Sequence, residues 1–181
     1  MIESEKLYVG EIFEKWYRVP EYQRPYVWGK DQIAELLQDL NDAMNRDDNA
    51  QYFLGSMVLQ KKSLEKSNTH YVEYDVLDGQ QRLTTLFLLI AVIRDLTGDE
   101  DCFKTCKEII FQKKNVFKNI PERLRIIFDI RQEVKDFINS YVKEEKSTLK
   151  VTSSLIQSYS KDTDLSVINM SKNIVQIREY F

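Results

Sequence analysis

Five consecutive residues, Asp78-Gly-Gln-Gln-Arg82, combine groups that could bind an anion. Gly79 lets the backbone approach a ligand closely, and the amides of Gln80 and Gln81 could read a base, a sugar or a phosphate. Arg82 can donate two parallel hydrogen bonds to a phosphate, while Asp78 could hold Mg²⁺ or position a water molecule. The pattern predicts a phosphate site in which Asp78, Gln81 and Arg82 carry the chemistry.

The position of this block supports the same interpretation. It lies between a predicted strand and a predicted helix that starts near Gln80. A helix start presents unpaired N–H groups and the positive end of the helix dipole, and both attract anions. Helix capping is the alternative, because Asp78 followed three residues later by Gln81 is close to a capping box. Capping does not explain Arg82, so both interpretations stay open.

A second group of candidate residues lies in Val19-Pro-Glu-Tyr-Gln-Arg-Pro-Tyr-Val-Trp28. Its prolines favour an extended chain, in which alternate side chains share a face. That face would carry Tyr22, Arg24, Tyr26 and Trp28. An arginine among aromatic rings can stack on a base and clamp a phosphate. The alternative is core packing, which we favour for Tyr26 and Trp28, while the role of Arg24 stays open.

The segment Phe53-Leu-Gly-Ser56 is a third and weaker candidate. It lies in a predicted strand, Tyr52–Gln60. A glycine inside a strand indicates a bulge or a close approach of a ligand. Gly55 and Ser56 are therefore added to the candidate binding residues.

Several familiar catalytic centres are absent from the sequence. The five glycines are isolated, so neither a P-loop nor a dinucleotide-binding glycine motif can be formed. The single histidine, His70, has no partner motif, and Cys102 and Cys106 are expected to be ordinary cytosolic thiols. Cysteine and histidine alone cannot supply a four-ligand zinc site. We do not expect this chain alone to cleave DNA, because a catalytic metal usually needs several protein ligands.

The charge and hydropathy patterns limit the possible partners. A net charge of −3 argues against a chain that mainly coats nucleic acid. Seven basic residues between Lys104 and Arg125 could touch phosphates, although a solvated helical surface is the alternative. The most apolar run, Leu86–Ile93, is shorter than the roughly 20 residues that span a bilayer. With no secretory signal pattern, the chain is expected to be cytoplasmic and free of membrane contacts.

Hydrophobic periodicity predicts the elements that position these residues. The helix after the Asp78–Arg82 block is apolar nearly all round, which places it at the centre of a core. The predicted fold is α+β (α/β-like), a small sheet with packed helices. Predicted strands are Tyr17–Val19, Tyr52–Gln60 and His70–Leu77; predicted helices are Val9–Glu14, Asp31–Met44 (capped by Asp31), Gln80–Leu96, Glu100–Phe111, Arg131–Val142 and Leu165–Phe181; Lys61–Asn68 is a predicted turn and Ser153–Ser160 is predicted to be irregular.

Three of these motifs together resemble the N-terminal domain of the GmrSD-type restriction endonucleases. They are the Val19–Trp28 segment, Phe53-Leu-Gly-Ser-Met-Val-Leu59 and Val76-Leu-Asp-Gly-Gln-Gln-Arg-Leu-Thr-Thr-Leu86, which match in order and spacing. The resemblance implies a ParB/sulfiredoxin-like core that binds a nucleoside triphosphate, GTP favoured, with Mg²⁺, and hydrolysis in some members. It implies phosphate and metal roles for Asp78, Gly79, Gln80, Gln81 and Arg82, with Asp78 as metal ligand and Tyr22, Gln23 and Arg24 as neighbours.

The resemblance also sets the expected organisation. Residues 1–98 would form the nucleotide-binding core and residues 99–181 a helical extension, expected to be truncated because the last helical pattern has no stop signal. Three functions stay open: an NTP-hydrolysing module of a modification-dependent antiphage restriction system, a nucleotide-gated DNA-sensing module without turnover, and a scaffold. DNA would be reached through the full-length protein or through a separate nuclease domain or subunit. A homo-oligomer is also possible.

Overall fold

Three short parallel strands form the centre of the sheet. The computed structural model describes residues 3–46, 51–62, 72–117, 119–129 and 131–181. Strand β1 (Trp16–Val19) lies between β3 (Glu73–Asp78) and β6 (Ile126–Phe128) and runs parallel to both. Strand β2 (Val58–Lys61) pairs with β3 in the antiparallel sense, so the sheet order is β2-β3-β1-β6. The carboxyl ends of β1, β3 and β6 therefore lie at one edge of the sheet.

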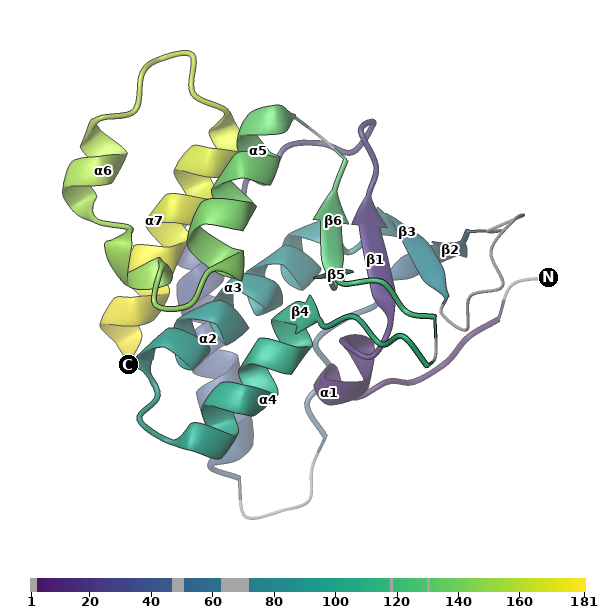
Figure 1. Ribbon diagram of the computed structural model, residues 1–181. Helices are drawn as coiled ribbons and strands as arrows, with labels where there is room; N and C mark the ends of the chain where they lie inside the picture. The colour runs from purple at the N-terminus through teal and green to yellow at the C-terminus, as the bar shows by residue number, and fades with distance from the viewer. Residues whose placement is uncertain (1–2, 47–50, 63–71, 118, 130) are drawn as a thin grey trace.

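Most helices gather on one side of the molecule, and the sheet lies on the other together with the short helix Val9–Ile12 (Figure 1). In the described residues the helices are α1 (Val9–Ile12), α2 (Lys30–Met44), α3 (Gln80–Leu96), α4 (Glu100–Ile110), α5 (Gln132–Phe137), α6 (Ser153–Gln157) and α7 (Leu165–Tyr180). A π-helix, η1 (Ile138–Lys143), continues α5, and a 3-10 turn, η2 (Thr148–Lys150), follows it. Two short strands, β4 (Phe111–Gln112) and β5 (Arg123–Leu124), pair separately from the main sheet.

Helix α3 lies in the middle of the core, as its all-round apolar sequence predicts. Leu83, Phe87 and Leu88 are fully buried in it. The same hydrophobic cluster includes Val76 of β3 and Ile174 of α7. Elements before and after residue 98 thus share one core, and the mixed α+β fold expected from the sequence is confirmed.

The secondary structure corrects several expectations. The strand predicted for Tyr52–Gln60 is too long, since only Val58–Lys61 is a strand and the preceding residues are irregular. Ser153–Ser160 is not irregular throughout, because it contains α6. The helix predicted from Asp31 starts at Lys30 and has Gly29 at its N-cap position.

The part of the chain after residue 98 is not purely helical. Strand β6 belongs to the main sheet and pairs with β1. Its three residues are too few to show a clear alternation in the sequence, so this strand was missed. The division at residue 98 remains a prediction about domains. His70 and most of the Lys61–Asn68 turn lie outside the described residues.

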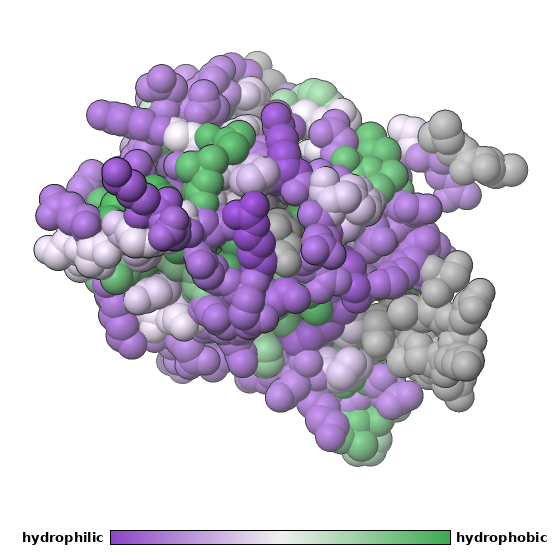
Figure 2. All heavy atoms as spheres, turned by 90° about the horizontal axis from the view of Figure 1, so that it is seen from above, coloured by the Kyte–Doolittle hydropathy of each residue, from purple (hydrophilic) through white to green (hydrophobic). Residues whose placement is uncertain are grey.

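No helix in the described ranges is long and apolar enough to cross a bilayer. The face in Figure 2 is mostly hydrophilic, with hydrophobic side chains in separate small groups.

A buried ion pair closes the C-terminal end of α3. Arg94 Nε donates to Asp95 Oδ1 at 2.7 Å, and both side chains are almost fully buried. Asp95 also accepts from the backbone N and hydroxyl of Thr148, at 3.0 and 2.7 Å, while Arg94 donates to the carbonyls of Lys143 and Glu144. Burial alone would raise the pKa of Asp95, but the hydrogen bonds from Arg94 and Thr148 outweigh it and lower that pKa.

A second buried carboxylate, Glu73, ties β3 to its neighbours. It accepts from Arg18 Nε at 3.0 Å and forms an ion pair with Arg123. The Arg123 guanidinium lies 4.4 Å from the centre of the Trp16 ring. Burial opposes ionisation of Glu73, yet the bonds and charges of Arg123 and Arg18 prevail and lower its pKa.

We expect the free energy of unfolding to fall at acidic pH because of these two carboxylates. A carboxyl group whose pKa is lowered by folding stabilises the protein above its unfolded pKa, about 4, and that stabilisation is lost as the pH falls through its folded pKa. Urea unfolding at a series of pH values from about 7 to about 3 measures the effect. In Asp95→Asn the decline should be shallower than in the wild type. An unfolding free energy that is constant over this range would contradict the assignment.

Candidate functional site

The candidate residues lie where the parallel strands end. Strand β1 ends at Val19 and leads into residues 20–28. Strand β3 ends at Asp78, and only Gly79 separates it from α3. In open sheets with parallel strands, ligands bind outside the carboxyl ends of the strands. The two strongest sequence motifs are therefore together at the edge where a ligand site is expected.

The side chain of Gln81 joins the two motifs. Its Oε1 accepts hydrogen bonds from the backbone N of Val27 at 2.8 Å and of Trp28 at 3.2 Å. Its Nε2 donates to the Pro25 carbonyl at 3.0 Å. Gln81 is buried, with 5% of its surface exposed, so its amide is occupied by the neighbouring backbone. This contact gives Gln81 a structural role beside the catalytic role predicted for it.

Two further glutamine amides act in the same way. Gln80 Nε2 donates to the Arg24 carbonyl at 2.8 Å. In the opposite direction, Gln23 Nε2 donates to the carbonyls of Val76 and Leu77, at 3.1 and 3.0 Å. These bonds fix residues 23–28 against β3 and the start of α3. The binding roles predicted for Gln23 and Gln80 remain predictions.

Arg82 lies against an aromatic ring and a stretch of backbone. Its Cζ lies 5.8 Å from the centre of the Trp28 ring, and its side chain is half-buried. A Cβ on Gly55 would lie 2.4 Å from Arg82 Nη1, so the Gly55 backbone sits directly against the guanidinium. In the described part of the chain no carboxylate pairs with Arg82. Its charge is therefore available to an anionic ligand.

The start of α3 is shaped by Gly79. This residue has φ +88° and occupies the N-cap position, and no side chain accepts a hydrogen bond there. The capping box that Asp78 and Gln81 could have formed is therefore absent here, since the Gln81 amide binds elsewhere. The first backbone bond of α3 runs from Leu83 N to Gly79 O, so the preceding N–H groups have no partner within the helix.

The exposed candidates are Tyr22, Arg24, Gly55, Ser56 and Asp78. The shared face predicted for Tyr22, Arg24, Tyr26 and Trp28 is wrong, because Tyr22 is 71% exposed and Tyr26 only 3%. A turn in which Gln23 N donates to Pro20 O breaks the alternation. Core packing is confirmed for Tyr26, and Trp28 packs partly buried against the core. The sequence motifs also predict that Arg24, Gln81 and Arg82 converge on one concavity with Asp78 at its rim, and this stays a prediction.

Helix α7 supports the site, and sequence reasoning missed this. Ser166 Oγ accepts from Tyr26 N at 3.0 Å, and Asn169 Nδ2 donates to Tyr26 O at 3.0 Å. The Tyr26 hydroxyl accepts from Asn173 Nδ2 at 2.9 Å and bonds to Thr85 of α3 at 2.7 Å. Burial raises the pKa of Tyr26 to about 12. The spacing of Ser166, Asn169 and Asn173, three or four positions apart, marks a polar face of α7, but it does not identify the segment that this face contacts.

Three of the seven basic residues in the run Lys104–Arg125 form ion pairs with carboxylates. Lys104 pairs with Glu100 at 2.9 Å, Lys107 pairs with Glu145, and Arg123 pairs with Glu73. Such pairing favours the solvated-surface interpretation over a phosphate-binding one.

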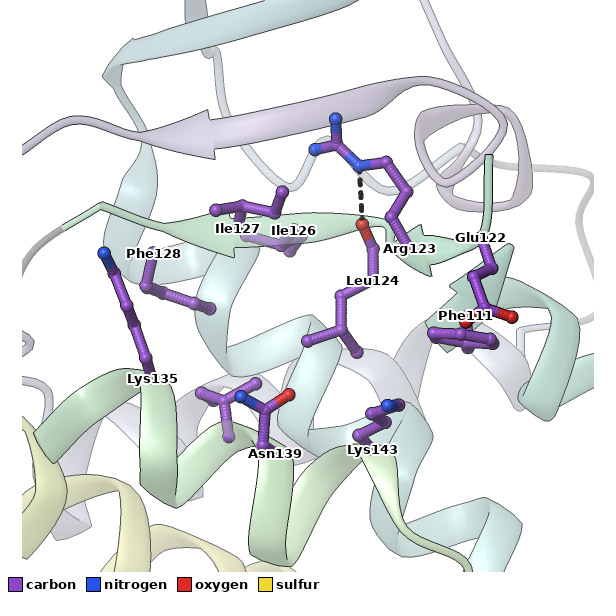
Figure 3. A pocket seen from close by; sticks show the side chains of 11 residues that line it. Phe111, Glu122, Arg123, Leu124, Ile126, Ile127, Phe128, Lys135, Asn139 and Lys143 are labelled. Carbon is purple, nitrogen blue, oxygen red and sulfur yellow. Dashed lines mark hydrogen bonds between the residues drawn. The ribbon is translucent and has the colours of Figure 1, made fainter. Parts of the chain in front are cut away.

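A hollow of about 280 Å³ lies elsewhere, between β6 and the helix formed by α5 and η1. Its apolar wall includes Leu124 and Phe128, and Lys135, Asn139 and Lys143 rise from the helix toward the strand (Figure 3). Arg123 of the basic run lines it, whereas no candidate residue from the three motifs does.

Gly55→Ala tests the close contact with Arg82. An added methyl group would collide with the guanidinium, and φ +112° at this position strains any side chain. We expect ligand affinity at this edge to fall about tenfold or more, because Arg82 must move. Gly98→Ala is the matched control, since nothing lies within 4 Å of its Cβ. Titration with GTP and Mg²⁺ measures both variants, and equal affinities would contradict the contact.

The chain is therefore a mixed α+β domain in which hydrogen bonds from glutamine side chains join the two motifs at the carboxyl ends of β1 and β3. The chain matches the family model described as "GmrSD restriction endonuclease, N-terminal domain" over residues 5–181, and it belongs to that family. The resemblance seen in the motifs is thereby confirmed across nearly the whole chain. No curated protein matches the chain closely enough to count as a relative.

Proposed function

We propose that this domain binds a nucleoside triphosphate, GTP favoured, at the carboxyl edge of β1 and β3, and hydrolyses it with Mg²⁺. The observation that carries the proposal is Arg82, a half-buried arginine placed by Trp28 and Gly55 with no carboxylate partner in the described residues. An arginine in this setting is a receptor for a phosphate, which its planar guanidinium can bind through two hydrogen bonds.

The surroundings of Arg82 suit a phosphate chain. The open N–H groups at the start of α3 add donors and a favourable dipole. Gly79 leaves room for Met57 to pack against the start of α3. The exposed Tyr22, Arg24 and Ser56 are available for the base, the sugar or further phosphates. The glutamines would act by fixing this arrangement, which reduces the ordering that binding requires.

Asp78 is the residue that would hold Mg²⁺. In the ranges that the structure describes, no group of three or more His, Cys, Asp or Glu could hold a metal ion. Mg²⁺ commonly binds through one or two carboxylates together with substrate phosphates, so a single exposed carboxylate fits a metal that arrives with the nucleotide. Such an ion neutralises charge on the phosphates during transfer.

Purified protein incubated with radiolabelled GTP and Mg²⁺ tests the function. Saturable binding with release of labelled phosphate is the expected result. Asp78→Asn should keep binding but lose most of the release, because the change removes the charge that holds the metal. A chain that neither binds nor hydrolyses GTP, ATP, CTP or UTP would refute the proposal.

The second candidate is a nucleotide-gated DNA-sensing module without turnover. The amides of Gln23, Gln80 and Gln81 favour this function, because they bind the backbone and are not free to act in hydrolysis. Asp78 is then the acidic group of the signature that remains for catalysis. Saturable binding without phosphate release would select this function. In either case DNA would be engaged within a larger restriction system, and this chain alone is expected not to cut it.

A further inference from the structure

Helix α7 reaches the candidate phosphate site through two successive contacts. Asn173 Nδ2 donates to the Trp28 carbonyl at 2.8 Å. The Trp28 ring lies against the Arg82 guanidinium, 5.8 Å from ring centre to Cζ. Asn173 is 1% exposed and comes from an element about 90 residues further along the chain than Arg82. We propose that Asn173 is a positioning residue for Arg82, so that ligand binding at the edge is linked to the docking of α7.

Residues 28–30 lie between α3 and α7 and form hydrogen bonds to both helices. On one side, Gln81 of α3 accepts from the backbone N of Trp28 at 3.2 Å. On the other, Asn173 binds its carbonyl, and Gln176 Nε2 donates to the Lys30 carbonyl at 2.8 Å. The backbone of Trp28 is thus fixed at both its N–H and its C=O. Loss of either bond frees the peptide that sets the ring position.

The number of α7 contacts argues for positioning in addition to packing. Ser166, Asn169, Asn173 and Gln176 all bind backbone atoms of residues 26–30. Packing of α7 against the core requires only its apolar residues, such as Met170 and Ile174. The polar contacts therefore have a further role. Polar groups that are buried and paired in this way specify one geometry. The specified geometry is that of the segment that carries Trp28.

Linkage gives the proposal a measurable consequence. If a well-docked α7 favours the ligand-ready position of Arg82, bound ligand must favour docking of α7 to the same extent. Amide hydrogen exchange in α7 should therefore slow when GTP and Mg²⁺ bind, although α7 itself touches no ligand. This consequence rests on the proposed function, whereas the position of Trp28 can be measured without any nucleotide.

Asn173→Asp is the central test, because a carboxylate has nearly the same shape as the amide but cannot donate to the Trp28 carbonyl. Protein labelled with 5-fluorotryptophan gives one ¹⁹F signal for each of its two tryptophans, Trp16 and Trp28, and a Trp28→Phe sample assigns them. We expect the Trp28 signal to move and the Trp16 signal to stay. Affinity for GTP with Mg²⁺ should fall about tenfold or more, because Asn173 Nδ2 no longer donates to the Trp28 carbonyl or to the Tyr26 hydroxyl.

Two further variants keep the test decisive. Asn139→Asp makes the same chemical change at an exposed site on η1 and should alter neither readout. Asn173→Leu, which has a similar size but neither donor nor charge, replaces Asn173→Asp if that variant does not fold. An unmoved Trp28 signal, or a moved signal with unchanged GTP affinity, overturns the inference. Absence of nucleotide binding in the wild type refutes the proposed function and its link to α7, while the Trp28 signal still decides whether Asn173 positions that residue.

Discussion

Arg82→Ala is expected to abolish nucleotide binding while the domain stays folded. Two charge-assisted hydrogen bonds to a phosphate contribute roughly 1.5–3 kcal/mol each, so their loss lowers affinity by about a hundredfold or more. The fold should lose little, because the contact of Arg82 with Trp28 is a cation–π interaction of about 0.5–1 kcal/mol. Equilibrium titration with GTP and Mg²⁺, together with urea unfolding, measures both quantities.

Two comparisons make this prediction specific. Arg46→Ala removes an exposed arginine beyond the end of α2 and should change neither quantity. Leu86→Ala truncates a buried side chain of α3 and should lower the free energy of unfolding by about 2–5 kcal/mol. If Arg82→Ala lowers the free energy of unfolding as much as Leu86→Ala, the signature is an element of the fold. That result would favour the scaffold interpretation.

Asp95→Ala should produce the largest loss of stability. Arg94 is 1% exposed, and removal of its partner leaves a buried charge without compensation. Breaking such a pair lowers the free energy of unfolding by about 3–5 kcal/mol. The backbone N and hydroxyl of Thr148 lose their acceptor as well. Urea unfolding at neutral pH provides the measurement.

The control for this prediction is Asp162→Ala, which removes an exposed aspartate from the loop before α7. Its unfolding free energy should stay within about 0.5 kcal/mol of the wild type. If Asp95→Ala lowers the free energy of unfolding by less than about 1 kcal/mol, Arg94 has found another partner and the account of this buried pair is wrong.

The long amphipathic and apolar elements could be predicted from the sequence because their periodicity extends over several turns. Helices α2, α3, α4 and α7 lie within one or two residues of their predicted bounds. Strand β6 has only three residues, which is too short for a period-two pattern to be recognised. The predicted Tyr52–Gln60 strand failed for a different reason. Gly55, at φ +112°, interrupts the extended backbone where the chain passes over Arg82.

The motifs of the candidate site could be found in the sequence, but the contacts among them could not. Residue types marked Gln80 and Gln81 as polar groups at a helix start, where a ligand or a backbone carbonyl can satisfy an amide equally well. The structure places the carbonyls of Arg24 and Pro25 there. The contribution of Asn173 depends on a contact 145 residues apart in the chain, and no local pattern encodes such a pairing.

A crystal structure of the domain with a non-hydrolysable GTP analogue and Mg²⁺ tests the central claim most directly. The account predicts the phosphates at the carboxyl edge of β1 and β3, with the guanidinium of Arg82 on a phosphate and the Gln81 amide still bound to the backbone of residues 25–28. A nucleotide bound elsewhere, for example in the hollow between β6 and η1, with Arg82 still against Trp28 and free of ligand, would contradict it.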